Sequence, residues 1–176
     1  MRPVILFAAC LSLLFCFHNC RQQETKNEIY TVADSLLSLT LGLQLKISSP
    51  EIQRMHDFQQ EINRDLPLLK PIVDKDTSVT SYMELYNGLG QCMHVCNQYH
   101  EEAFMLESSL REIMDQIQSR EADLKSLETR LQFEIDNYRD LSRRIDSSLN
   151  IAIRQAETFY RLKPEIDRIR EQVQLP

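Results

Sequence analysis

The sequence predicts an all-α protein, in which short N-terminal helices pack on a long coiled-coil-like helix or on a helical hairpin. Two observations indicate this fold. Glycine and proline, which interrupt helices, number only 3 and 6 among 176 residues. Apolar residues recur at alternating spacings of three and four through the second half of the chain, the heptad pattern of helices that pack side by side.

The N-terminus has the pattern of an export signal. Arg2 is followed by an uncharged, mostly apolar run over residues 4–17. This run suits the apolar region of a signal peptide and is short for a membrane span of about 20 residues. Cys20 follows the run, and polar residues without apolar periodicity come next. The segments expected from this pattern are a signal peptide at 1–19, a polar tether at 20–28 and a single elongated helical domain at 29–176.

These N-terminal residues resemble the signal of bacterial lipoproteins, in which the cysteine becomes the first mature residue and carries the lipid. The resemblance covers about residues 1–20. The class usually has a small residue before the cysteine and an aliphatic residue earlier, where this chain has Asn19 and Phe17; such relaxed forms resemble those of the Bacteroidota. The resemblance implies lipid attachment at Cys20, and two or more acyl chains anchor stably. The alternative is an uncleaved signal anchor in which Cys20 is an ordinary thiol.

The charge of the chain argues against some classes of partner. The formal net charge is −6, and removal of residues 1–19 would take away Arg2 and no acidic residue. No basic face is present in the sequence. This composition counts against nucleic acid and against electrostatic binding to anionic lipid.

The helices are expected at about 29–47, 50–74, 81–162 and 164–174. Residues 37–47 can also be interpreted as a β-strand, because leucines alternate there with polar residues and Gly42. A helix is favoured because no second strand of similar quality is present for pairing. Ser49 and Pro50 predict a sharp helix start.

Breaks are expected at several later points. Pro67 predicts a kink or restart near Asp65. Residues 74–80 are predicted to form a loop. Ser81 and Glu84 are predicted to form a capping box that starts the next helix. Pro164 predicts a kink or end after Leu162.

The long helix admits two architectures. Its apolar heptad positions include Leu110, Ile113 and Ile117, are interrupted by Arg120, and slip by a four-residue stutter from Leu131 to Ile135. One architecture is a continuous helix, and the other is a hairpin that turns between 119 and 148. The continuous helix is favoured because no glycine or proline marks a turn there.

The sharpest side-chain cluster is Cys92, Cys96 and His100, which share one helix face at intervals of four residues. Sulfur and imidazole groups are ligands for zinc or copper, and the further ligands available are Met93, His94 and His56. Buried free thiols are the favoured reading, because cysteine packs as a small apolar residue. A disulfide between chains is a third reading, since two cysteines one turn apart in a helix are poorly placed for a bridge.

Other groups of residues are interpreted as structural rather than functional. His94, Glu101 and Glu102 lack a nucleophile or phosphate cradle beside them, and residues 87–90 lack the preceding strand of a nucleotide loop. Residues 139–146 read as a solvated face with local ion pairs. Core packing is the interpretation of four aromatic residues: Tyr82, Tyr86, Tyr99 and Phe104.

The function expected from these patterns is non-catalytic and needs no cofactor. The first hypothesis is a lipid-anchored helical protein of a bacterial envelope, facing the periplasm or cell surface, that acts as a scaffold, spacer or assembly subunit. Its partners would be the membrane, through the lipid, and a protein or a second copy, through coiled-coil surfaces. The alternatives are a small ligand- or metal-binding helical-bundle module and a secreted toxin or immunity-type factor.

Overall fold

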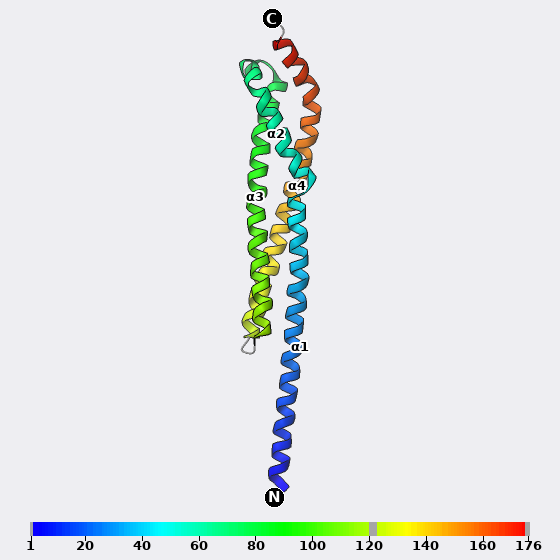
Figure 1. The fold of residues 1–176 in the computed structure, drawn as a ribbon, viewed down its shortest axis with the longest axis vertical. Helices are drawn as coiled ribbons and strands as arrows, with labels where there is room; N and C mark the ends of the chain where they lie inside the picture. The colour runs from blue at the N-terminus through cyan, green and yellow to red at the C-terminus, as the bar shows by residue number, and fades with distance from the viewer. Residues whose placement is uncertain (1, 120–122, 175–176) are drawn as a thin grey trace. The chain divides into compact units, whose positions relative to one another are not determined.

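A computed structural model describes the backbone of residues 2–119 and 123–174, and the side chains of residues 23–73, 75–119 and 123–173. Over these residues the chain forms α-helices and one 3-10 helix, without a strand (Figure 1). The elements are α1 (Arg2–Ile47), α2 (Pro50–Leu69), the 3-10 helix η1 (Lys70–Lys75), α3 (Thr77–Gln118) and α4 (Leu124–Gln174). The all-α prediction is confirmed, and the strand reading of residues 37–47 is wrong.

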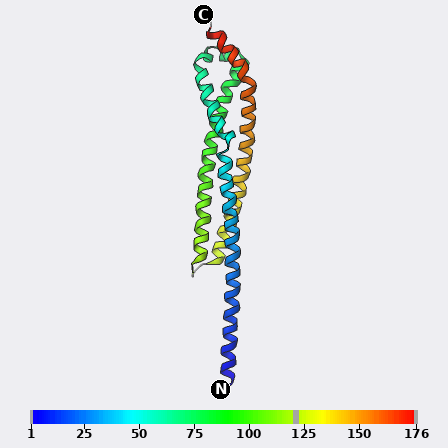
Figure 2. The ribbon, with the colours of Figure 1, turned by 45° about the vertical axis from the view of Figure 1, so that its right-hand side comes forward.

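The hairpin is the correct architecture for the second half of the chain. Figures 1 and 2 show α3 and α4 running back along one another, so the favoured continuous helix over residues 81–162 is wrong. Asp123 caps the start of α4, where its side chain lies 3.4 Å from the Ser126 amide and its carbonyl accepts from the Leu127 amide at 3.1 Å. The start of α4 is therefore stabilised by an aspartate cap, and no glycine or proline is needed to begin the helix.

A second aspartate cap corrects the predicted start of α3. Asp76 Oδ1 accepts hydrogen bonds from the amides of Ser78 at 2.8 Å and Val79 at 3.2 Å. The helix therefore begins at Thr77, one turn before the predicted capping box at Ser81. In place of the loop expected at 74–80, the chain has only a short junction between η1 and α3.

The prolines disturb the helices less than expected. Helix α2 continues through Pro67 and changes to η1 only at Lys70, beyond the kink predicted near Asp65. Pro164 lies inside α4, which continues to Gln174. Around Pro164 the side chains of Leu162, Ile166 and Ile169 are buried, and we infer that their packing outweighs the missing backbone hydrogen bond.

Helix α1 extends through the segment predicted as a tether. Residues 20–28 are helical, and Gln, Glu and Lys, which are good helix formers, recur in this segment. The Lys26 ammonium donates a hydrogen bond to the Ser119 carbonyl at 2.9 Å. The described part of this segment is thus attached to the turn that ends α3.

The chain divides into two compact units. Unit 1 contains residues 1–40 and 105–138, and unit 2 contains residues 41–104 and 139–176. The core of unit 1 is built from α1, the end of α3 and the start of α4. Its buried residues are Ile29, Ala33, Leu36, Leu37, Leu106, Leu110, Ile113, Ile117, Leu127 and Leu131.

A carboxylate occupies a core position of unit 1. Glu134 is 9% exposed and accepts hydrogen bonds from Ser109 Oγ at 2.5 Å and Asn137 Nδ2 at 3.0 Å. Counting Glu134 as a core residue, the heptad continues from Leu131 to Leu141 without a slip. The predicted stutter to Ile135 is therefore wrong, although Ile135 packs at the edge of the core.

Unit 2 is built around stacked aromatic rings. The rings of Phe58 on α2 and Phe159 on α4 are stacked with centroids 4.2 Å apart. Tyr82 on α3 lies against Phe159 at 6.1 Å. Because the three rings come from three helices, they hold α2, α3 and α4 together, and such pairs contribute about 1 kcal/mol beyond their burial.

A polar cluster lies beside these rings. Asp65 is 3% exposed and accepts from Tyr82 Oη at 3.1 Å, Arg170 Nη1 at 3.0 Å and Lys163 Nζ at 3.3 Å. Lys163 also pairs with Glu61 at 2.8 Å and Asp167 at 2.7 Å. Burial opposes the charge of Lys163, but these hydrogen bonds and carboxylates outweigh it and raise its pKa.

Tyr82 predicts a measurable pH dependence. Burial, followed by the Asp65 charge and hydrogen bond, raises the pKa of Tyr82 above its usual value of 10.0. The folded state then keeps the phenol proton while the unfolded state loses it, so stability falls as pH rises through the unfolded pKa. Between pH 8 and pH 11 we expect the parent to lose about 1.4 kcal/mol more than Tyr82→Phe in urea unfolding. Equal losses in the two proteins would contradict this account.

Gly42 predicts a stabilising substitution. It lies inside α1, and a Cβ added there would meet no described atom within 4 Å. Gly42→Ala should raise the free energy of unfolding by about 0.5–1 kcal/mol, because alanine loses less backbone entropy in a helix. Urea unfolding checks this value. Gly88→Ala is the matched control and should gain less, because its Cβ would lie 2.7 Å from Gln155 Nε2.

Candidate functional site

The predicted lipid-attachment residue lies outside the described side chains. Cys20 belongs to residues 1–22, for which only the helical backbone from Arg2 is described. Lipid attachment at Cys20 therefore stays a prediction.

The predicted cysteine face of α3 is divided between core and surface. Cys92 and Cys96 are 7% and 5% exposed, whereas His100 is exposed. The Cys92 sulfur lies 3.9 Å from the Ser148 carbonyl oxygen on α4. Both thiols are free, which agrees with the favoured reading of buried thiols.

The two thiols interact with one another. Their mutual hydrogen bond raises the pKa of Cys92, with burial adding to the effect, and lowers the pKa of Cys96 despite burial.

A groove in unit 2 brings part of the predicted cluster together with α2. Its volume is about 460 Å³, and its lining includes Ile52, His56, Met93, Cys96, Asn97 and His100. His56, which comes from α2, is hydrogen-bonded to Gln60 at 2.8 Å. Sequence reasoning named His56 only as a further ligand, because the position of α2 against α3 could not be read from spacing.

The other predicted ligand, His94, does not join this groove. It is exposed and lies 3.3 Å from Gln98 one turn further along α3. Among the described residues, no group of three or more histidine, cysteine or acidic side chains is arranged to hold a metal ion. The geometry therefore does not provide a site for zinc within that part of the chain.

Glu102, one of the two acidic residues beside the cluster, belongs to an ion-pair network. Glu102 pairs with Arg144 of α4, and this hydrogen bond raises the Arg144 pKa. Arg144 also pairs with Asp140 at 2.8 Å and lies 5.1 Å from the Tyr99 ring centroid. Residues 139–146 thus have the predicted local ion pairs and, in addition, a contact to α3.

The structure of α3 tests two further predictions. Residues 87–90 lie within the helix, so they do not form a nucleotide loop. Tyr82 and Tyr99 are in the core as predicted. Phe104 is 65% exposed, and its assignment to the core is wrong.

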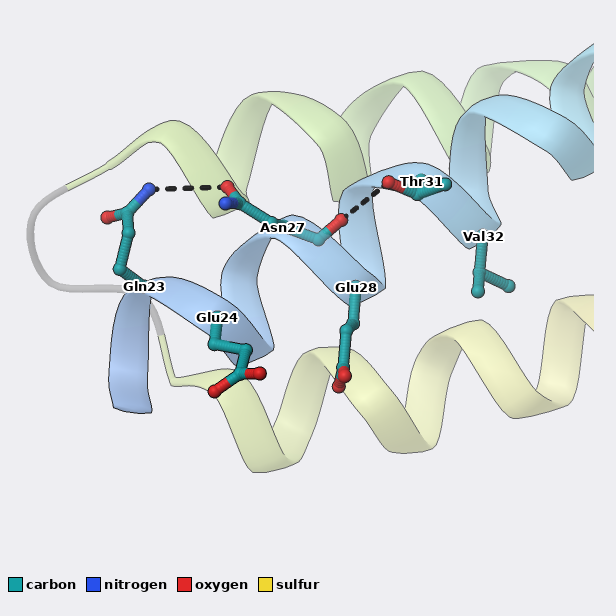
Figure 3. A pocket seen from close by; sticks show the side chains of 6 residues that line it. All are labelled: Gln23, Glu24, Asn27, Glu28, Thr31 and Val32. Atoms are coloured by element: carbon teal, nitrogen blue, oxygen red, sulfur yellow. Dashed lines mark hydrogen bonds between the residues drawn. The ribbon is translucent and has the colours of Figure 1, made fainter. Parts of the chain in front are cut away.

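A second groove lies on α1 in unit 1 and was missed by sequence reasoning. Its volume is about 880 Å³, and Figure 3 shows the six residues that line it: Gln23, Glu24, Asn27, Glu28, Thr31 and Val32. Gln23 donates to Asn27 at 3.3 Å, and Thr31 donates to the Asn27 carbonyl at 2.8 Å. Glu24, Glu28 and Val32 follow one another at intervals of one turn, so two carboxylates and one apolar side chain lie on the same face of α1.

No protein-family model, curated protein or solved structure matches the chain. Among the helices of the described part, none combines the length and apolar character that crossing a membrane requires.

Proposed function

We propose that the mature chain is a lipid-anchored, non-catalytic helical protein of a bacterial envelope. It acts as a scaffold, spacer or assembly subunit and binds a partner through helix surfaces. The observation that carries the anchoring is the sequence order of one positive residue, an uncharged apolar run at 4–17 and Cys20. A lipid on Cys20 holds the helical bundle at a membrane surface.

Exposed apolar side chains support the binding role. In unit 1, Leu39 is 53% and Phe133 is 64% exposed, and in unit 2 Leu45 is 75% exposed. Large apolar side chains on a helix surface are the groups that a partner helix would bury. Exposed acidic residues such as Glu28 and Glu128 accompany them and would help to select the partner.

Lipid labelling tests the anchor. Cells that express the full chain are fed an alkyne fatty acid, and the label and membrane fraction are compared for the parent and Cys20→Ser. We expect both label and membrane association to disappear in Cys20→Ser. Cys16→Ser is the matched control, because this cysteine lies in the apolar run, and it should keep both. A parent chain without label would overturn the lipid anchor.

Photo-crosslinking in whole cells tests the binding surface. A photoreactive amino acid at Phe133 should capture a discrete partner, which mass spectrometry identifies as an envelope protein or a second copy. The same group at Glu128, a polar exposed position on α4, is the control for random collision. Equal capture at both positions would exclude the surface around Phe133 as a specific binding site.

A further inference from the structure

One face of α1 in unit 1 is apolar in its middle and acidic at one end. Figure 3 shows that the side chains of Glu24, Glu28 and Val32 point to the same side of α1, where they border the groove of about 880 Å³. Val32 is 44% exposed, and Leu39, two turns further along the same side, is 53% exposed. Among the described side chains, no cation pairs with Glu24 or Glu28. These four residues are called the acidic face.

A second exposed face lies on α4 in unit 2. Ile153 is 45% and Tyr160 is 59% exposed, and their separation of seven positions places both on one side of the helix. Arg161 and Arg168 are exposed beside them. The guanidinium of Arg168 lies 3.5 Å from Glu165, and Arg161 has no ion pair within the described part of the chain. Ile153, Tyr160 and the two arginines are called the basic face.

The two faces have matching spacing. Val32 and Leu39 are seven positions apart, as are Ile153 and Tyr160, so each pair covers about 10 Å of helix. If an antiparallel arrangement places Leu39 opposite Ile153, Val32 falls opposite Tyr160. In the same register the two glutamates of the acidic face fall opposite the end of the basic face that carries its two arginines. Apolar side chains thus meet apolar ones, and carboxylates meet guanidinium groups.

The charge around each face agrees with this pairing. The described side chains of unit 1 include ten acidic residues and four basic ones, whereas residues 139–170 of α4 include eight basic residues and five acidic ones. Opposite charges bring such surfaces together and oppose the pairing of either face with itself. A second copy of this chain supplies the charge and the spacing that the acidic face requires.

We propose that the acidic face of one copy binds the basic face of a second copy by antiparallel helix packing. This inference rests on the proposed function, because it names the partner of the scaffold. Each copy has both faces, and the two faces are different surfaces. The contact is therefore heterologous, and copies join head to tail. The lipid anchor takes no part in the contact.

Photo-crosslinking of the full chain in whole cells tests the pairing. A photoreactive amino acid in place of Val32 should give an adduct with the mass of two chains. Mass spectrometry should place the other end of the crosslink within residues 150–164 of α4. The same amino acid in place of Asp34, which is exposed on the opposite side of α1, is the matched control and should give little adduct.

Charge reversal tests the register. In the photoreactive chain, Glu24→Arg with Glu28→Arg should lower the yield of the adduct at least about tenfold, because guanidinium groups would then face one another. Arg161→Glu with Arg168→Glu should have the same effect. Co-expression of a photoreactive chain that carries the first pair of substitutions with a tagged chain that carries the second pair should restore the adduct. Circular dichroism of each variant verifies the helical fold.

The outcomes separate this inference from the proposed function. Self-association is overturned if the photoreactive group at Val32 captures a different protein, if it captures none, or if reversed charges leave the yield unchanged. Capture of an envelope protein at Phe133 would in that case still support the scaffold function. Restoration of the adduct by the two complementary variants supports the contact between copies.

Discussion

Replacement of Asp65 by alanine should lower the free energy of unfolding by about 3 kcal/mol, because it removes the common partner of two cations and a buried phenol. Arg170 and Lys163 would lose a carboxylate that is 3% exposed, and Tyr82 would lose its hydrogen-bond acceptor. Lys163 would retain its ion pairs with Glu61 and Asp167. The expected loss of stability is therefore at the lower end of the range for breaking a buried ion pair. Urea unfolding followed by circular dichroism measures this change.

The Lys46–Asp146 ion pair supplies the matched control. Its nitrogen–oxygen distance is 2.9 Å, and the two side chains are 48% and 52% exposed. Asp146→Ala should cost less than about 1 kcal/mol, because solvent screens an exposed pair. If the two alanine variants lose similar stability, the polar cluster around Asp65 does not stabilise unit 2 in the way described.

Phe159→Ala should be the most destabilising single truncation, at about 4 kcal/mol. Phe159 is 3% exposed, its ring stacks on Phe58 with centroids 4.2 Å apart, and the Tyr82 ring centroid lies 6.1 Å away. The substitution removes a large buried ring and leaves a cavity among three helices. The same urea experiment measures the loss.

Phe104→Ala makes the same chemical change at a side chain that is 65% exposed. It should change stability by less than about 0.5 kcal/mol, because little apolar surface is lost from the core. A large effect at Phe104, or a small one at Phe159, would show that the exposed and buried rings have been assigned to the wrong environments.

The class of fold could be predicted from sequence because heptad spacing is a local property. The core of unit 1 follows the predicted positions at Leu106, Leu110, Ile113 and Ile117. The prediction of core residues from sequence failed where a carboxylate occupies a core position. No core position was predicted for Asp65 or Glu134, since most of their hydrogen-bond partners lie on other helices and are remote in sequence.

The helix ends show a related limit. The hairpin with the α3–α4 turn was only the less favoured alternative because glycine or proline was expected at a turn, whereas Asp123 and Asp76 start their helices by capping free amides. Aspartate before a helical pattern was the available signal. At the candidate site, the burial of Cys92 and Cys96 could be predicted from residue type. The approach of His56 could not, because it depends on how α2 packs on α3.

The contact between Lys26 and Ser119 has a consequence for the order of folding. Helices α3 and α4 are joined by residues 119–123, so their pairing closes a short loop. Docking of α1 beside that turn joins groups 93 residues apart. Since loop closure costs about 0.6 kcal/mol for each doubling of length, docking α1 costs roughly 2.5 kcal/mol more entropy than closing the hairpin. This difference in entropy favours formation of the hairpin before α1 docks on it.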